Sequence, residues 1–401
     1  MAVLSKKLYI KNSSGTQQTA EIYTTIDEAG ANYLSLKVDS TTAYIPLVST
    51  DHANATAGRV KKGSTTYAIA KKKAGLLHSN STTLSAAREY LAATSVGNYA
   101  LFAGGSGSTV VDAYNSSLTR TIPTSLSANR DWFAAASVGS YALFSGGGDY
   151  FTASFSSVDV YNTSLTRSST TSLIYGVEGH SGTSNSSYAL FAGGVDEESV
   201  LVSNVNAYNA SLTRSNPNRL STTKSGMGAA SIGKYALFAG GCDESSTRLT
   251  TVEVYDTSLT KSTATSLSIK RDSPGSASNG SYALFAGGYV DYNTNATDVV
   301  DIYTTSLVRS TGANLSQKRY YLVGATADNY ILFAGGRISS GTTASSVVDA
   351  YDASLTHSVT ESIATARYHF AAASVGSYAL FGGGYTGSSA PYSNIVDAYL
   401  G

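Results

Sequence analysis

The sequence predicts an all-β protein, a seven-bladed β-propeller with a small β-rich domain at its N-terminus. The main observation is a repeat, because the string Tyr-Ala-Leu-Phe-Ala-Gly-Gly or a close variant occurs seven times in the 401 residues. The spacings are 42, 47, 47, 47, 48 and 48 residues, counted between Tyr99, Tyr141, Tyr188, Tyr235, Tyr282, Tyr330 and Tyr378. Helical periodicity is absent from the whole repeat region. β-rich repeats of about 40 to 50 residues are typical of propeller blades.

Each repeat contains four expected strands, named a to d in chain order. In the second repeat, strand a is expected within residues 130–139, strand b within 141–147 and strand c within 157–161, and strand d ends near Leu173. Turn-forming Gly, Asn and Ser residues separate these segments. Small Ala and Ser side chains suit strand a, because the innermost strands of a propeller converge on a crowded axis. The apolar strand b suits burial on both faces between neighbouring blades.

These motifs resemble the kelch repeat, which has a basic residue before strand a, a strand b ending in Gly-Gly and a tyrosine on strand c. The resemblance covers residues 77–401 and implies a propeller fold. Kelch blades usually carry a tryptophan seven residues after the strand-c tyrosine, but this chain has small hydroxyl residues there: Thr121, Ser168, Ser215, Ser262, Ser310 and Ser358. We therefore expect a divergent branch of the family, with a differently packed outer edge.

The ends of the repeat region predict how the ring closes. The seventh repeat stops with residues 395–401, which correspond to strand c, and no strand d follows. Residues 77–85, upstream of the first repeat, resemble the strand-d segment that ends at Ser127. We expect 77–85 to supply the missing outer strand of blade seven, so that no blade keeps an open interface.

Opposite charges recur at two fixed positions in six of the seven repeats. Eleven residues before the tyrosine of strand b stand Arg88, Arg130, Lys224, Arg271, Arg319 and Arg367. On strand c stand Asp112, Asp159, Glu253, Asp301, Asp349 and Asp397. One interpretation is a ring of cations at the channel mouth for an anionic ligand; the other is six salt bridges within blades. The third repeat has Val177 and Asn206 instead, and this joint loss favours partly exposed salt bridges worth roughly 0–1 kcal/mol each.

The loops between strands b and c, and the segments before strand a, vary from repeat to repeat and leave from one face. Constant strands with divergent loops are typical of a binding surface on a rigid scaffold, although drift of exposed loops gives the same pattern. The aromatic residues there favour binding, because exposed Tyr and Trp are enriched in contact surfaces. The candidate ligand-binding residues are Tyr90, Trp132, Asp149, Tyr150, Phe151, Asp196, Glu197, Asp243, Tyr289, Asp291, Tyr292, Tyr320, Arg337, Tyr368, His369, Tyr385 and Tyr392.

Composition and motifs argue against several other functions. With 27 basic and 27 acidic residues the net charge is zero, which is unlike a nucleic-acid-binding protein. Cys242 is the only cysteine, so an intrachain disulfide is excluded, and we expect this residue in an exposed loop. Kelch-like copper oxidases need a cysteine–tyrosine crosslink and two histidine ligands, and no spacing here supports such a site. The chain also lacks a Gly-x-Ser-x-Gly elbow, a phosphate loop and an EF-hand, so we expect no enzyme, no metal and no cofactor.

Residues 1–76 lie outside the repeats, and their pattern predicts short strands, a hairpin over 59–69 and a basic linker over 71–75. No apolar leader or membrane-spanning stretch is expected. The layout resembles bacteriophage tail or virion-surface proteins, in which an N-terminal module binds other particle proteins and a distal β-rich module meets the host. We therefore expect a tail or virion-surface protein, made in the host cytoplasm, that recognises a glycan or protein of the host surface. The alternatives are a scaffold of a particle or cytoplasmic complex without a receptor role, and a divergent enzyme.

Overall fold

The chain forms two compact units, Met1–Gly75 and Leu76–Gly401. In this computed structural model the described residues of the second unit are 76–149, 153–291, 296–338, 343–387 and 391–401. In the first unit the backbone of residues 3–11, 17–26, 32–38, 41–46, 58–62 and 65–69 is described. All regular structure in these ranges is β-strand, and none of them holds a helix able to cross a membrane.

The first unit is a six-stranded antiparallel sheet with the order β4-β3-β2-β1-β6-β5. Its strands are β1 (Val3–Lys11), β2 (Gln17–Ile26), β3 (Asn32–Val38), β4 (Thr41–Pro46), β5 (Gly58–Lys62) and β6 (Thr65–Ile69). Strands β1 to β4 form a meander, and the β5–β6 hairpin joins it where Lys11 pairs with Ala68. The basic linker lies outside the described residues.

The second unit is a seven-bladed β-propeller, as the repeats predict, and the described residues give seven four-stranded antiparallel sheets. The inner strands a are β8 (Ala92–Val96), β12 (Ala134–Val138), β17 (Ser181–Ser184), β22 (Gly228–Ile232), β26 (Gly275–Ser278), β30 (Val323–Ala327) and β34 (Ala371–Val375). The strands b are β9 (Tyr99–Ala103), β13 (Tyr141–Ser145), β18 (Tyr188–Ala192), β23 (Tyr235–Ala239), β27 (Tyr282–Ala286), β31 (Tyr330–Ala334) and β35 (Tyr378–Gly382).

The two outer strands complete each blade. The strands c are β10 (Val111–Asn115), β14 (Val158–Asn162), β20 (Val205–Asn209), β24 (Val252–Tyr255), β28 (Val300–Thr304), β32 (Val348–Tyr351) and β36 (Val396–Leu400). The strands d are β11 (Arg120–Thr121), β15 (Arg167–Thr170), β21 (Arg214–Ser215), β25 (Lys261–Thr263), β29 (Arg309–Thr311), β33 (His357–Val359) and β7 (Leu77–Asn80). Blade three has an additional short ladder between β16 (Val177–Glu178) and β19 (Val195–Asp196).

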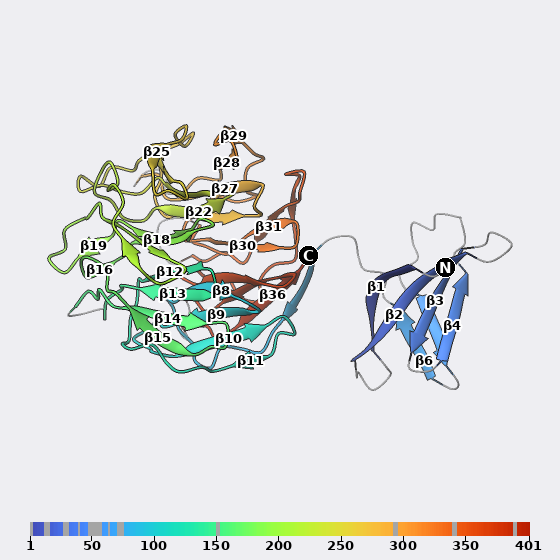
Figure 1. Ribbon diagram of the computed structural model, residues 1–401. Helices are drawn as coiled ribbons and strands as arrows, with labels where there is room; N and C mark the ends of the chain where they lie inside the picture. Colours follow the sequence, from blue (N-terminus) through green and yellow to red (C-terminus); the bar gives the residue numbers. More distant parts are fainter. Residues whose placement is uncertain are drawn as a thin grey trace. The chain divides into compact units, whose positions relative to one another are not determined.

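The ring is closed by strands from distant parts of the chain. In blade seven the sheet order is β34-β35-β36-β7, and Tyr399 of β36 pairs with His78 of β7. Figure 1 shows the blades following one another in sequence order, so that the red strand β36 comes to lie beside the first blades in cyan. The last strand c and the segment before the first repeat therefore share one sheet.

The core consists of layers between neighbouring blades. In every strand b the residues after the leading tyrosine are buried, as in Ala142, Leu143 and Phe144. One hydrophobic cluster joins Phe102 and Tyr114 of blade one to Leu380 of blade seven, and six similar clusters of described residues join the other neighbours. Each blade is thus stabilised mainly by apolar surface buried against the next.

The strand-c tyrosines occupy the outer part of these layers. Tyr161 is fully buried, and its hydroxyl donates a 2.7 Å hydrogen bond to the carbonyl of Thr124 in the preceding blade. The same bond recurs in five further blades, from Tyr208, Tyr255, Tyr303, Tyr351 and Tyr399. A buried tyrosine tied to the neighbouring blade therefore packs the outer edge.

At the axis, hydroxyl groups of strands a connect the blades. The Ser374 hydroxyl donates to the carbonyl of Thr326 at 2.8 Å, and the Ser95 hydroxyl donates to the carbonyl of Ser374 at 2.5 Å. Small Ala, Gly, Ser and Thr side chains leave a channel of about 270 Å³ along these strands. The Gly-Gly ends of strands b allow close packing beside it: a Cβ atom on Gly105 would lie 2.4 Å from the Glu89 carbonyl oxygen.

Candidate functional site at the channel mouth

The residues of the two charged repeat positions form salt bridges inside the blades. The distances are 2.7 Å for Arg88–Asp112, 3.0 Å for Arg130–Asp159, 2.7 Å for Lys224–Glu253 and 2.5 Å for both Arg271–Asp301 and Arg367–Asp397; Arg319 pairs with Asp349 in the same way. Every one of these side chains is at most 1% exposed. The expectation of partly exposed pairs was therefore wrong. Buried and neutralised, these cations cannot offer a charged ring to an anionic ligand.

Each buried carboxylate also contacts a second basic residue, on strand d, which sequence reasoning missed. Asp159 lies 3.0 Å from Arg130 and 2.7 Å from Arg167, and Asp397 lies 2.8 Å from His78 of the closing strand. The other outer partners are Arg120, Lys261, Arg309 and His357. The signal was present in the sequence, because a basic residue or histidine stands at the first or second position of strand d in every blade.

Blade three replaces this network with neutral groups. Asn206 accepts a 3.1 Å hydrogen bond from the backbone of Ile174, while Arg214 instead donates to the carbonyl of Ser172. Val177 is buried at the position where the other blades have the Arg or Lys that precedes strand a, here called the inner cation. The inner cation and the carboxylate are thus exchanged together, as expected for a structural network.

The residue two positions after each inner cation defines a ring at the channel mouth, here called the mouth ring. All seven residues have left-handed backbone, with φ of 57° for Tyr90, 54° for Trp132, 62° for Gly179, 65° for Gly226, 50° for Ser273, 53° for Tyr321 and 53° for His369. Glycine adopts this conformation without strain, whereas for other residues it costs about 1–2 kcal/mol. Five of the seven blades keep a non-glycine residue despite this cost, which makes the mouth ring a candidate functional site.

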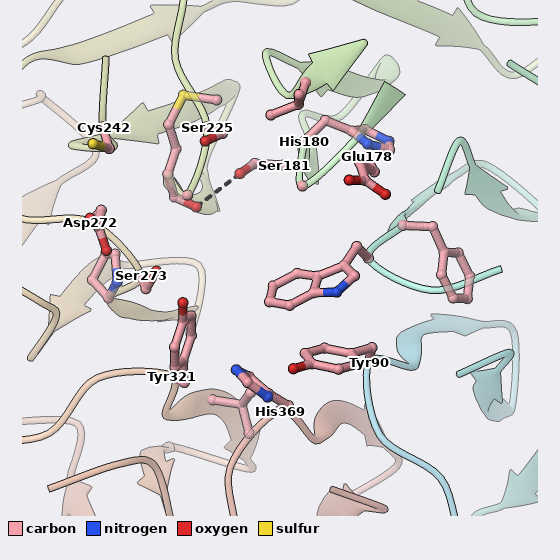
Figure 2. Close-up of a pocket in the computed structure, with 18 of the residues that line it drawn as sticks. Tyr90, Glu178, His180, Ser181, Ser225, Cys242, Asp272, Ser273, Tyr321 and His369 are labelled. Atoms are coloured by element: carbon pink, nitrogen blue, oxygen red, sulfur yellow. Dashed lines mark hydrogen bonds between the residues drawn. The ribbon is translucent and has the colours of Figure 1, made fainter. Parts of the chain in front are cut away.

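The mouth-ring residues with aromatic side chains lie in four consecutive blades. They are Tyr321 of blade six, His369 of blade seven, Tyr90 of blade one and Trp132 of blade two. The rings of Tyr90 and Trp132 stack with centroids 4.1 Å apart, and His369 lies 4.3 Å from Tyr90 and 4.4 Å from Tyr321. Trp132 and Tyr321 approach edge to face at 6.5 Å. Figure 2 shows Tyr90, His369 and Tyr321 together along one side of the pocket. These side chains form a continuous aromatic wall.

The opposite side of the mouth ring is open and polar. Blades three, four and five contribute Gly179, Gly226 and Ser273, and a Cβ atom added to Gly179 would meet nothing within 4 Å. Ser181, Ser225, Glu178 and Asp272 line this half together with Cys242 (Figure 2). Cys242 is half-buried in the cavity wall, so placing it in an exposed loop was wrong. The two halves enclose about 510 Å³.

Burial controls the protonation of the ionisable groups in this region. It lowers the pKa of His180 to about 3 and also lowers the pKa of His369, whose Nδ1 lies 3.3 Å from Glu89. Burial raises the pKa of Asp272, although Arg248 contacts its carboxylate at 2.9 Å. Both histidines are therefore neutral at pH 7. Nε2 of His369 is buried and has no hydrogen-bond partner among the described residues.

Most of the residues singled out from the sequence fall into three groups. Tyr90, Trp132 and His369 line the cavity. Aromatic pairs stand outside its wall, with Tyr289 near Tyr320, Tyr368 near Tyr385 and Tyr385 near Tyr392, and Arg337 lies over the rings of Tyr320 and Tyr368. The carboxylates of Asp149, Asp196 and Asp243 accept hydrogen bonds from backbone groups of their own loops.

The five other sequence candidates either do not line the cavity or lie outside the described residues. Glu197 is exposed and Asp291 is half-buried, and neither lines the cavity. Tyr150, Phe151 and Tyr292 lie outside the described residues. Sequence reasoning missed Tyr321, Glu178 and Asp272. Gly179 and Gly226, which occupy the position of Tyr321 in blades three and four, were the available signal for Tyr321, because glycine is common where the backbone is left-handed. No cluster of three or more His, Cys, Asp or Glu residues suited to a metal occurs in the part of the chain that the structure describes.

Comparison with known proteins supports the fold alone. No family model and no curated protein matches the chain. Many solved structures do match, among them one described as "Structure of YjhT", with a TM-score of 0.57 and 15% sequence identity over 70% of this chain and 99% of that chain. At this level of identity the likeness is one of architecture.

Proposed function

We propose that this chain is a non-enzymatic receptor-binding protein whose propeller binds a glycan of a host surface at the channel mouth. The observation that carries the proposal is the aromatic wall, in which Tyr90, Trp132, Tyr321 and His369 all keep a left-handed backbone. Strain of this kind persists where the surrounding structure enforces it, and it concentrates at ligand sites. Two equivalent blades use glycine, so the fold itself does not require a ring at this position.

The cavity has the size and chemistry of a small-ligand site. Its volume of about 510 Å³ is in the usual range of about 300–1,000 Å³, and one apolar wall faces a few polar groups. Aromatic faces accept the apolar face of a sugar ring, since flat stacking buries C–H groups against the π system. The hydroxyls of Ser181, Ser225 and Ser273 and the carboxylate of Glu178 supply hydrogen-bond partners on the other side.

The wider setting is part of the same proposal. The repeats form a divergent branch of the kelch family, supported by the cation before strand a, the Gly-Gly end of strand b and the strand-c tyrosine. The separate six-stranded unit attaches the propeller to a particle such as a phage tail, supported by its division from the propeller at Gly75. The host-facing part is then the propeller.

A fluorescence titration tests glycan binding directly, because Trp132 is the only tryptophan in the chain. A panel of soluble host-surface oligosaccharides is titrated into the full chain, and we expect a saturable change in Trp132 emission with at least one of them. Tyr321→Gly, which keeps the reporter and copies blades three and four, should weaken this binding by about tenfold, as expected for loss of an aromatic contact worth 1–3 kcal/mol.

Two further variants make the result specific. Gly179→Tyr should also weaken binding, because the added ring fills the open half of the cavity. Tyr175→Ala is the matched control, since Tyr175 is 48% exposed and does not line this cavity. Binding that survives both mouth-ring variants, or that Tyr175→Ala abolishes, would place the ligand elsewhere. A flat titration with every oligosaccharide would contradict the proposal.

A further inference from the structure

The channel mouth is bordered by negative charge. At the repeat position immediately after the inner cation, four blades carry carboxylates: Glu89, Asp131, Glu178 and Asp272. Glu178 and Asp272 line the cavity itself, and none of the described residues that line it is Lys or Arg. The two lining histidines, His180 and His369, have lowered pKa values and add no positive charge at pH 7.

Two arginines near this wall already contact other groups. Arg248 contacts Asp272 at 2.9 Å and lies over the ring of Tyr289, with 4.7 Å to its centroid. Arg337 lies over Tyr320 and Tyr368. Glu178 has no salt-bridge partner among the residues that the structure describes. Of the two carboxylates in the cavity wall, Asp272 is therefore neutralised by Arg248, whereas Glu178 is not neutralised by a described residue.

The aromatic wall and the carboxylates both favour a positively charged group on the ligand. A cation within about 6 Å of an aromatic face is attracted by the ring quadrupole, most strongly by tryptophan. An ammonium group also forms strong hydrogen bonds to a carboxylate. An anionic sugar, in contrast, would bring its charge toward Glu178 in a partly desolvated site, where like charges repel strongly.

We infer that the ligand of the channel mouth carries a protonated amine, so that the glycan recognised is built from amino sugars with free amino groups. This inference rests on the proposed glycan-binding function and adds its substrate class. In the bound state, one sugar ring contacts the wall formed by Tyr90, Trp132 and Tyr321. Its ammonium group is directed toward Glu178 on the opposite side.

Three tetrasaccharides of different charge test the inference in the full chain. They are the β-1,4-linked glucosamine tetramer, its fully N-acetylated counterpart and a galacturonic acid tetramer, each titrated against Trp132 fluorescence. We expect the glucosamine tetramer to bind at least about tenfold more tightly than the acetylated one, and the acidic tetramer to bind most weakly. The preference should be larger at about pH 6, where most of the sugar amines are protonated, than at about pH 9, where they are neutral.

A matched pair of variants assigns the preference to the site. Glu178→Gln keeps the size and polarity of the side chain and should reduce the preference for the glucosamine tetramer by about fivefold or more. Glu197→Gln removes an exposed carboxylate from the loop of the same blade and should leave the preference unchanged. Equal losses in the two variants would show a general charge effect and overturn the assignment to Glu178.

The possible outcomes separate the inference from the function it rests on. If the acetylated or the acidic tetramer binds as tightly as the glucosamine tetramer, the mouth is a glycan site without amine selectivity, and the inference fails while the proposed function stands. If none of the three tetramers changes Trp132 emission but another neutral or acidic glycan does, the inference fails as well. If no glycan of any charge binds, both fail.

Discussion

Nε2 of His180 lies 2.9 Å from the hydroxyl of Ser145, and both residues depart together from their repeat positions. Ser145 stands at the end of strand b, where the other blades have alanine or glycine. His180 stands three residues after the inner-cation position, where the others have Leu91, Phe133, Met227, Pro274, Leu322 and Phe370. Both side chains are buried, so each supplies the polar partner that the other needs.

We expect the effects of Ser145→Ala and His180→Leu on stability to be coupled. Each single variant leaves one buried polar group without its partner and should cost about 1–3 kcal/mol. The double variant restores residues that other blades carry and should cost less than the sum, by about 1 kcal/mol or more. Urea unfolding of the four proteins measures this difference. Additive losses would show that the hydrogen bond contributes nothing of its own.

The lowered pKa of His180 also predicts that the folded protein loses stability in acid. The pKa of His180 is lowered to about 3 in the folded protein, whereas an unfolded histidine titrates near 6.5, so the unfolded chain binds the extra proton between these values. Stability is therefore fully present above about pH 6.5 and should fall below it, by up to about 1.4 kcal/mol per pH unit. Unfolding curves between pH 7 and pH 4 measure the slope. The Ser145→Ala/His180→Leu variant should show a shallower slope, and an identical one would assign the effect to other groups.

The raised pKa of His78 predicts the opposite pH dependence for the stability of the closing strand β7. The hydrogen bond between His78 and Asp397 raises the pKa of His78, so this contribution is complete below the unfolded value near 6.5 and is lost as the pH rises through the higher folded value. Amide exchange in β7 should therefore show a loss of protection above neutral pH. His78→Arg copies the partner found in blades one, two and five and should keep the protection. Equal pH responses in both proteins would exclude His78 as the cause.

Asp301 tests the buried charge network. Asp301→Asn leaves Arg271 fully buried without its anion and should cost about 3–5 kcal/mol. Adding Arg271→Val reproduces the Val177 and Asn206 pair of blade three, and we expect the double variant to be more stable than Asp301→Asn alone. Chemical unfolding compares the three proteins. A double variant less stable than the single one would show that blade three depends on compensations outside this pair.

The number and order of blades could be predicted from the sequence because strand b is encoded almost identically seven times. The pairing of Arg271 with Asp301 could also be predicted, since the equivalent positions of blade three, Val177 and Asn206, have both lost their charge. Their complete burial was not, because it depends on how neighbouring blades and loops cover the pair. One repeat does not contain that information.

The residues of the mouth ring could be predicted only in part from the sequence. Tyr90, Trp132 and His369 were identified as aromatic residues near strand a, but Tyr320 was chosen over its neighbour Tyr321. Side chains next to each other in an extended chain point to opposite sides, and a left-handed residue changes that direction. L-amino acids rarely adopt this conformation, so an aromatic residue gives no sign of it. Only Gly179 and Gly226 at the equivalent positions indicated it.

Closure of the ring through β7 and β36 constrains the order of events during synthesis. Asn80 of β7 pairs with Asp397, more than 300 residues later in the chain. At about 5–20 residues per second, the ribosome needs roughly 15–60 seconds to produce this partner. During that time the first blade can form its four strands, while β7 stays outside any sheet. The ring can therefore close only after this partner strand has been synthesised, and until then β7 has no strand to pair with.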